Sequence, residues 1–185
     1  SISNIKDIFN NTPENKLQMF IEQYKDDSRQ GVANLVKRAA KKIDDYNKEI
    51  ERTYKLSEFE RKYSDYEFIC GIDEVGRGPL AGPVVAGAVI LPKDCDILYI
   101  NDSKKLSAKK REELYEVIME KAVCAKTAVV SPKVIDEINI LQATYEAMQQ
   151  AIYKLNPAPD MLLVDAVTIP EVTTKQVGIV KGDAK

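Results

Sequence analysis

Three segments of the sequence each end an apolar run with acidic side chains. Asp73 and Glu74 follow "FICGI", Asp165 follows "MLLV", and Asp183 follows "VGIVKG". Burying a carboxylate beside apolar strands costs free energy unless a metal ion or a proton stabilises it. A single acid of this kind is most often a solvated loop residue. Acids at the ends of several strands that converge at one edge of a sheet are a recurrent way to hold hard divalent cations. Three such strand ends therefore favour a metal site.

The two adjacent acids pose a geometric problem, because consecutive residues of a strand point to opposite faces of the sheet. Asp73 and Glu74 cannot share one site in an ideal strand. We therefore expect the strand to end or twist at Glu74, and the glycines that follow permit such a change of direction.

A glycine-rich loop, Gly76-Arg77-Gly78, comes directly after these acids. A dinucleotide-binding motif would need G-x-G-x-x-G between a strand and a helix. Here the third glycine, Gly82, is one residue late, and the segment "PVVAGAVIL" that follows has the pattern of a strand. The dinucleotide interpretation is excluded, and a plain tight turn between two strands explains the glycines but not the two acids.

The composition narrows the possible chemistry. The chain of 185 residues is 44% hydrophobic and 30% charged, as is ordinary for a globular protein, and it contains no histidine. The absence of histidine excludes serine–histidine triads, cysteine–histidine catalysis and histidine-ligated zinc. Carboxylates must therefore carry any acid–base catalysis or metal binding. The net charge of −2 makes no overall case for nucleic acid, so any such contact must come from local patches.

The cysteines and the apolar segments of the sequence suggest where the protein is located. Its three cysteines are odd in number and form no CxxC spacing, which is typical of buried thiols in a reducing cytosol. We recognise neither a signal peptide nor an apolar run of membrane-spanning length. The prediction is a cytoplasmic protein without a membrane partner.

Residues 1–62 have helical spacing and many charges. The sequence Thr12-Pro13-Glu14 predicts a helix start, followed by an apolar face at Leu17, Phe20, Ile21 and Tyr24. A second helix is predicted over 31–53, and its inward side chains are expected to be Val32, Leu35, Val36, Ala39, Ile43, Tyr46 and Ile50. Four cations of this helix, Lys37, Arg38, Lys41 and Lys42, form either a solvated face or a phosphate-binding patch.

From residue 66 onward, strands and helices alternate. "YEFICGID" and "GPVVAGAVIL" predict a hairpin, and "CAKTAVVS", "MLLVDA" and "VGIVKGD" predict three more strands. Helices are predicted from Ser107 to about 121, from Ser131-Pro132 onward, and near 140–155. The last of these places Thr144, Met148, Ala151, Ile152 and Leu155 on one face. The pattern predicts an α/β fold with a mixed sheet flanked by helices.

At these residues the sequence resembles the bacterial ribonucleases HII, which cut RNA in RNA–DNA hybrids. The matching segments are "GIDEVGRGPLAGPVV", "NDSKKLS", "IDEINI", "LLVDA" and "KGDAK", in the order of the family and over residues 66–185. The resemblance implies a ribonuclease H-like fold and a catalytic domain over 66–185. The helical residues 1–62 form an extension that some members carry.

The resemblance also implies roles for individual residues. Asp73, Glu74, Asp165 and Asp183 match the four acids that bind two Mg²⁺ or Mn²⁺ ions and carry the catalysis. Gly76, Arg77 and Gly78 match the loop that contacts the ribose 2′-hydroxyl, the group that distinguishes RNA from DNA. Lys104 of "NDSKKLS" matches a phosphate-contacting lysine, although a solvated loop lysine fits the sequence nearly as well. The implied partners are RNA–DNA hybrids and DNA that contains ribonucleotides, with no obligate protein partner.

Family members continue beyond the "KGDAK" segment, so we expect the chain to be truncated, with its own activity in doubt. Two alternatives stay open beside an active ribonuclease. One is another nuclease or strand-transfer enzyme of the same fold, which would cut all-DNA substrates. The other is a hybrid-binding protein that does not cleave.

Overall fold

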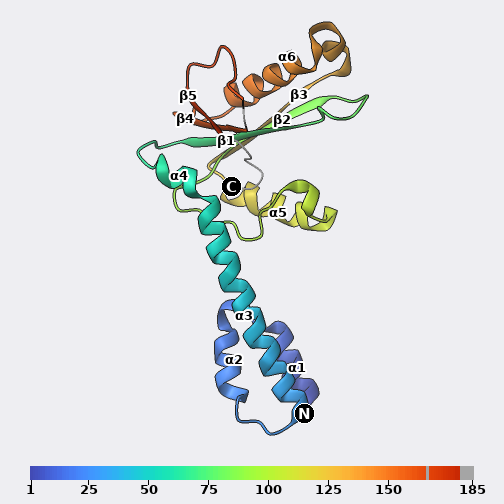
Figure 1. The fold of residues 1–185 in the computed structure, drawn as a ribbon, viewed down its shortest axis with the longest axis vertical. Coiled ribbons are helices and arrows are strands. Elements are labelled where there is room, and N and C mark those ends of the chain that lie inside the picture. Colours follow the sequence, from blue (N-terminus) through green and yellow to red (C-terminus); the bar gives the residue numbers. More distant parts are fainter. Residues whose placement is uncertain (166, 180–185) are drawn as a thin grey trace. The chain divides into compact units, whose positions relative to one another are not determined.

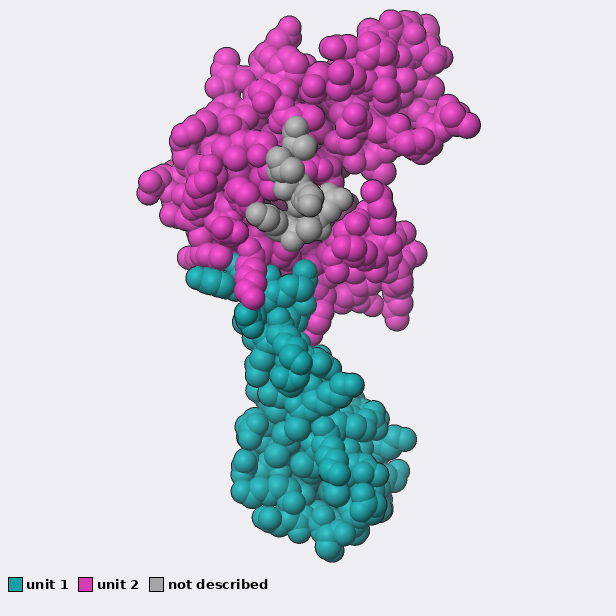
Figure 2. Space-filling model, in the orientation of Figure 1, with its two compact units in different colours: residues 1–54 teal, residues 55–185 magenta. Residues whose placement is uncertain are grey.

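The computed structural model describes residues 1–165 and 167–179. The chain divides into two compact units, Ser1–Tyr54 and Lys55–Lys185 (Figures 1 and 2). Each unit has its own apolar core.

Unit 1 is a small helical unit. Its elements are α1 (Ile2–Asn11), the 3₁₀ turn η1 (Glu14–Lys16), α2 (Leu17–Tyr24) and the long helix α3 (Gln30–Leu56). One apolar side of each α-helix contributes to a common core, as the spacing of their apolar residues requires. The buried members are Ile5, Phe9, Leu17, Phe20, Val32, Leu35 and Ala39. The predicted apolar face of 17–24 is confirmed, because Leu17 and Phe20 are buried and Ile21 and Tyr24 pack against them.

The structure differs from the sequence expectations at two places in α1 to α3. Thr12 does not start a helix but ends α1, and its hydroxyl donates to the carbonyl oxygen of Ile8 at 2.7 Å. Pro13 precedes a 3₁₀ turn, and the α-helix begins only at Leu17. Ile50, expected to point inward, is 43% exposed. Ile43 is the last residue of α3 that packs against the core of unit 1, and Ile50 lies beyond it.

Unit 2 contains a five-stranded mixed sheet in the order β3-β2-β1-β4-β5 (Figure 1). Its strands are β1 (Ile69–Val75), β2 (Val84–Ile90), β3 (Cys124–Val130), β4 (Met161–Asp165) and β5 (Lys175–Ile179). β1 and β2 form the predicted hairpin and are antiparallel, as are β2 and β3, whereas β1, β4 and β5 are parallel neighbours. The predicted mixed α/β sheet is confirmed.

One face of this sheet packs against helix α6 (Pro132–Tyr153). Alternate residues of the strands point to this face, as the two-residue period of a strand demands. In β1 these are Cys70 and Ile72, and in β4 they are Leu162 and Val164. Small and flexible side chains of α6 fill the spaces above them: Ala143, Thr144, Ala147, Met148, Ala151 and Ile152 are all buried. The burial predicted for the 140–155 helix is confirmed.

The remaining helices of unit 2 are shorter. α4 spans Glu58–Lys62, the 3₁₀ turn η2 spans Ser103–Lys105, and α5 spans Ala108–Lys121. Ser107 caps α5 as predicted, because its hydroxyl accepts the N–H of Lys110 at 3.2 Å. α5 lies on the side of the sheet away from α6 (Figure 1). Of the three cysteines only Cys70 is fully buried, and burial raises the pKa of its thiol to about 12. Within the described ranges, we find no helix long and apolar enough to cross a membrane.

Helix α6 contains a break at Asn139 that separates the two helices predicted from the sequence. Asn139 has φ 70° and ψ 163°, and its side-chain oxygen accepts the N–H groups of Leu141 (3.0 Å) and Gln142 (3.1 Å). This combination lies outside the left-handed helical region and strains any residue with a β-carbon. The asparagine side chain compensates in part, because it caps the helix that follows.

We therefore expect Asn139→Ala to destabilise the protein, since alanine loses the cap and keeps the strained backbone. The lost cap costs about 1 kcal/mol. Asn139→Gly loses the cap but tolerates the backbone, and we expect it to cost only a few tenths of a kcal/mol. Urea unfolding of the two variants beside the wild type measures the difference. Equal losses for alanine and glycine would contradict the assigned backbone role.

A candidate active site at the carboxyl ends of β1 and β4

The register between β1 and β4 is fixed by an aspartate at their amino ends. The carboxylate of Asp160 accepts the N–H groups of Glu67 and Phe68, each at 2.9 Å, and its own N–H donates to the Phe68 carbonyl oxygen at 3.1 Å. The two parallel strands then run together from the pair Ile69 and Met161. Sequence analysis did not single out Asp160, although an aspartate just before an apolar strand, in "PAPD", is a recognisable signal for such a clamp.

This register brings two of the predicted acids together at the carboxyl ends of the strands. Ile72 pairs with Val164, so Asp73 and Asp165 occupy the next position on neighbouring strands. Ile72 and Val164 face α6, and alternation places Asp73 and Asp165 on the other face. Asp73 is exposed and Asp165 half-buried, and the carboxylate of Asp73 accepts the N–H of Glu74 at 2.7 Å.

Glu74 lies within electrostatic reach of both aspartates. Burial raises the pKa of its carboxyl, a hydrogen bond from Arg77 lowers it, and the negative charges of Asp73 and Asp165 raise it further. The strand does not end at Glu74, as one of our expectations had it. β1 continues through Val75, and Glu74 pairs with Ala86 of β2. Its backbone therefore belongs to the sheet, and its side chain starts from the face opposite Asp73.

The donor set has the chemistry of a hard-cation site, because carboxylate oxygens are the ligands that such ions prefer. The repulsion at Glu74 is also what a bound cation would relieve. Among residues 1–165 and 167–179, however, no group of three or more acidic, cysteine or histidine side chains is arranged to hold a metal ion. The fourth predicted acid, Asp183, lies outside the described residues.

The loop after β1 turns sharply at Gly76. This residue has φ +102°, and a β-carbon placed on it would overlap the carbonyl oxygen of Pro83 and lie 3.2 Å from the Cα of Val84. Gly82 also has a positive φ of +128°, but a β-carbon there would meet nothing within 4 Å. Gly78 likewise has open space beside it. Close packing inside the hairpin loop thus explains Gly76, whereas it does not require Gly78 to be glycine.

Arg77 connects this loop to the acids. Its guanidinium donates to the Glu74 carboxylate at 3.3 Å, with side chains 43% and 17% exposed respectively. Exposed ion pairs contribute at most about 1 kcal/mol to stability. The contact therefore positions the arginine beside the acids more than it stabilises the fold.

We expect Arg77→Ala to lower any activity that depends on these acids by about 10-fold, the scale on which a contact that orients a ligating side chain acts. The melting temperature should change little, because the lost pair is partly exposed. Arg77→Lys keeps a cation without the planar fork, and its activity should lie between those of the wild type and Arg77→Ala. Activity measurements together with thermal unfolding check this, and a large loss of stability without a loss of activity would contradict it.

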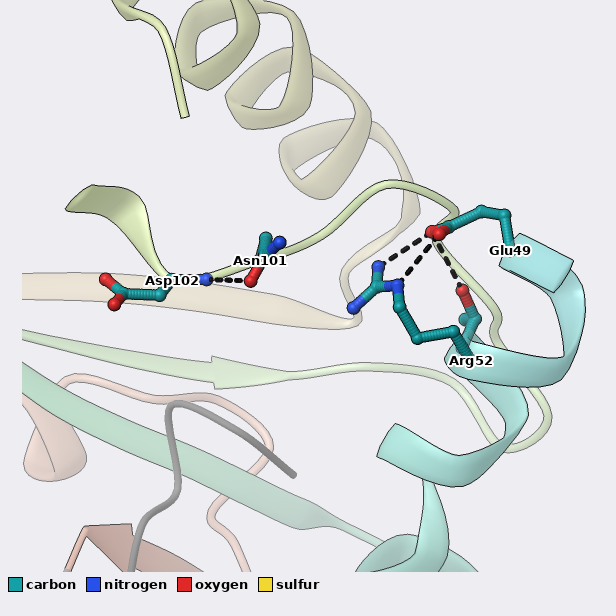
Figure 3. Close-up of polar contacts among 5 residues, drawn as sticks. Glu49, Arg52, Asn101 and Asp102 are labelled. Carbon is teal, nitrogen blue, oxygen red and sulfur yellow. Dashed lines mark hydrogen bonds and ion pairs between the residues drawn. The ribbon is translucent and has the colours of Figure 1, made fainter. Parts of the chain in front are cut away.

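Lys104 is exposed in η2, within the "NDSKKLS" segment. Its N–H donates to the carboxylate of Asp102 at 2.9 Å. The N–H of Asp102 in turn donates to the side-chain oxygen of Asn101 at 2.9 Å (Figure 3). These contacts order the turn that carries the lysine. The contacts found in the described part of the chain do not join Lys104 to the acids or to the glycine loop.

Comparison with known proteins gives the family. The family model of ribonuclease HII matches residues 70–185, and that of the ribonuclease HII N-terminal domain matches residues 1–64. The ribonuclease HII of Lachnoclostridium phytofermentans is 59% identical over 164 residues, which are 89% of this chain and 65% of that protein. The ribonuclease HII of Clostridioides difficile is 49% identical over 187 residues, 100% of this chain and 73% of that protein.

A solved structure supports the same assignment. The ribonuclease H2 of Pyrococcus horikoshii OT3 superposes with a TM-score of 0.53 and 26% identity, over 63% of this chain and 64% of that one. Its fold is the ribonuclease H-like fold expected from the sequence. The chain belongs to the ribonuclease HII family.

Proposed function

We propose that this protein is a metal-dependent endonuclease that hydrolyses the RNA strand of RNA–DNA hybrids. Its substrates would include single ribonucleotides embedded in DNA duplexes, with 5′-phosphomonoester products. The observation that carries the proposal is the meeting of Asp73 and Asp165 at the carboxyl ends of two parallel strands, with Glu74 within reach of both charges. Membership of the ribonuclease HII family supports it.

The proposed metal ligands are Asp73, Glu74, Asp165 and Asp183, and the proposed ions are Mg²⁺ or Mn²⁺. Two such ions would supply an activated water and stabilise the leaving oxygen during in-line attack on a phosphodiester. The four carboxylates supply hard oxygen donors and negative charge, which suits these ions and requires no histidine. Within the described residues, the shared register of β1 and β4 is what positions the first pair of donors.

The loop Gly76-Arg77-Gly78 is proposed to select the ribose. Gly78 has open space where a side chain would stand, so the backbone can approach the edge of a sugar. The 2′-hydroxyl is both a donor and an acceptor, which backbone N–H and C=O groups can satisfy. We further propose that Lys104 contacts a substrate phosphate from the ordered turn η2.

We also propose that residues 66–185 form the catalytic domain and residues 1–62 a separate helical domain. The compact units divide after Tyr54, and the two family models divide the chain between residues 64 and 70. Nucleic acid is the partner that this function requires, and no membrane or obligate protein partner enters it.

The test is cleavage of three labelled duplexes in Mg²⁺ or Mn²⁺, with a chelator as control. One duplex is an RNA–DNA hybrid, one carries a single ribonucleotide in DNA, and one is entirely DNA. We expect the first two to be cut and the third to stay intact. Cleavage of the all-DNA duplex would instead indicate a nuclease that does not recognise ribose. Binding without cleavage in Mn²⁺ would indicate a hybrid-binding protein.

A further inference from the structure

Helix α3 carries four cations within six residues: Lys37, Arg38, Lys41 and Lys42. All four side chains are exposed. Residues four apart lie above one another on a helix, so Lys37 and Lys41 form one row and Arg38 and Lys42 the next. Together these four side chains form the α3 basic face. No acid occurs between Gln30 and Ile43, whereas the segment after it is acidic, with Asp44, Asp45, Glu49 and Glu51.

The contacts of the α3 basic face leave its charges available. The charged groups of Arg38 and Lys42 each lie 5.0 Å from the centre of the Phe9 ring, a cation–π geometry, and Phe9 is 1% exposed. Both cationic residues are nevertheless exposed. In the described residues the four cations of this face form no ion pair.

Other cations of the same unit are paired. Lys25 pairs with Glu22 at 2.8 Å, and Arg29 with Asp27 at 2.6 Å. Arg52 donates to both carboxylate oxygens of Glu49, at 2.7 and 2.8 Å (Figure 3). Within the described part of unit 1, several cations are thus paired with acids, whereas the four of the α3 basic face are not.

Within α3 itself, the spacing of these like charges is unfavourable. Like charges four residues apart destabilise a helix by about 0.2–0.5 kcal/mol per pair, and the face contains two such pairs. The helix dipole favours cations near the carboxyl end, but this face lies in the amino-terminal half of the 27-residue helix. An anionic partner would relieve the repulsion between these cations, and its binding would be favoured for that reason.

The dimensions of the face suit a nucleic-acid backbone. The rise from residue 37 to residue 42 is about 7.5 Å. This is about two phosphate steps along one strand of B-DNA, which advances 3.4 Å per phosphate. The duplex is also the anion that the proposed function brings to this chain.

We propose that the α3 basic face binds backbone phosphates of the duplex substrate and thereby adds a contact from unit 1 to those made by the catalytic unit. The proposal takes the identity of the duplex from the proposed function. It predicts a contact without sequence preference, because phosphates carry no base information.

The test uses the full chain in the presence of a chelator, so that binding is measured without cleavage. Fluorescence anisotropy gives the Kd for a duplex with one ribonucleotide and for an all-DNA duplex between 50 and 200 mM salt. The variant K37Q/K41Q removes one row of the face and leaves Arg38 and Lys42 over Phe9. The control K25Q/K48Q removes two positive charges that are paired with Glu22 and Asp44.

We expect K37Q/K41Q to flatten the slope of log Kd against log salt by about 1.8, which is 0.9 for each lost phosphate contact, on both duplexes. The control should change the slope by less than half of that. The melting temperature of K37Q/K41Q should be equal to or above that of the wild type, because one like-charge pair is relieved.

An unchanged slope, or an equal flattening in the control, would overturn the proposal. Because binding is measured without cleavage, failure of the proposed catalytic function would leave this result interpretable. Conversely, normal cleavage with an unchanged slope would remove only the role of the α3 basic face.

Discussion

Replacing Asp73 by asparagine is expected to abolish cleavage while the fold stays intact. Losing an outer contact of a metal site typically costs 10–100-fold in activity, so losing a proposed ligand should exceed about 100-fold. The fold should persist because asparagine keeps an oxygen that can accept the N–H of Glu74, the bond that Asp73 makes at 2.7 Å. Single-turnover cleavage of the one-ribonucleotide duplex in Mn²⁺ measures the effect.

The same substitution should not lower thermal stability without metal. The charge of Asp73 raises the pKa of Glu74, which shows that the ionised acids repel one another. Removing one charge lessens this repulsion, so the melting temperature in a chelator should stay equal or rise. Asp65→Asn, at an exposed position outside the site, serves as the matched control. Near-wild-type turnover of Asp73→Asn would show that Asp73 is not a ligand.

The sequence was sufficient to predict most of the fold of unit 2, because its signals are local and agree with one another. The hairpin of β1 and β2, the Ser107 cap and the Ser131-Pro132 helix start all appear in the structure as predicted. The position of Asp73 and Asp165 directly after the last paired residues of β1 and β4 could be expected only in outline. The register of these strands depends on the Asp160 carboxylate and two backbone N–H groups more than 90 residues away in sequence.

Other features could not be predicted because they depend on tertiary packing. Thr12-Pro13 has the residue types of a helix start, but the preceding residues already form α1, and the threonine hydroxyl bonds back to Ile8. Whether Glu74 ends the strand is decided by its pairing with Ala86 across the hairpin, which the glycines alone do not determine. Likewise, the sequence could not show which glycine has room for a side chain. Gly78 has open space beside it, whereas a β-carbon on Gly76 would overlap the backbone.

Gly76→Val is the second substitution for which we expect a large effect. A side chain at Gly76 must adopt a left-handed backbone, at a cost of about 1–2 kcal/mol, and its β-carbon would overlap the Pro83 carbonyl oxygen. The loop must shift to relieve this overlap. Because the loop follows the acids directly, small misplacements of reacting groups should lower the rate by about 100-fold or more. Cleavage of the one-ribonucleotide duplex checks this, beside urea unfolding.

Two other glycines of the loop separate backbone strain from loss of the ribose contact. Gly82→Ala introduces the strain of a positive φ without an overlap, and Gly78→Ala introduces neither. If the loop matters only for folding, stability should fall most for Gly76→Val, less for Gly82→Ala and least for Gly78→Ala, with cleavage in the same order. If Gly78 lets the backbone reach the ribose, Gly78→Ala should lose at least about 10-fold in cleavage at unchanged stability.

The decisive comparison is therefore Gly78→Ala against Gly82→Ala. Space beside Gly78 is open in the folded protein, so a methyl group there obstructs only a molecule that comes from outside. We expect Gly78→Ala to be the more stable and the less active of the two. Normal cleavage by Gly78→Ala together with normal cleavage by Gly76→Val would show that this loop does not contact the ribose.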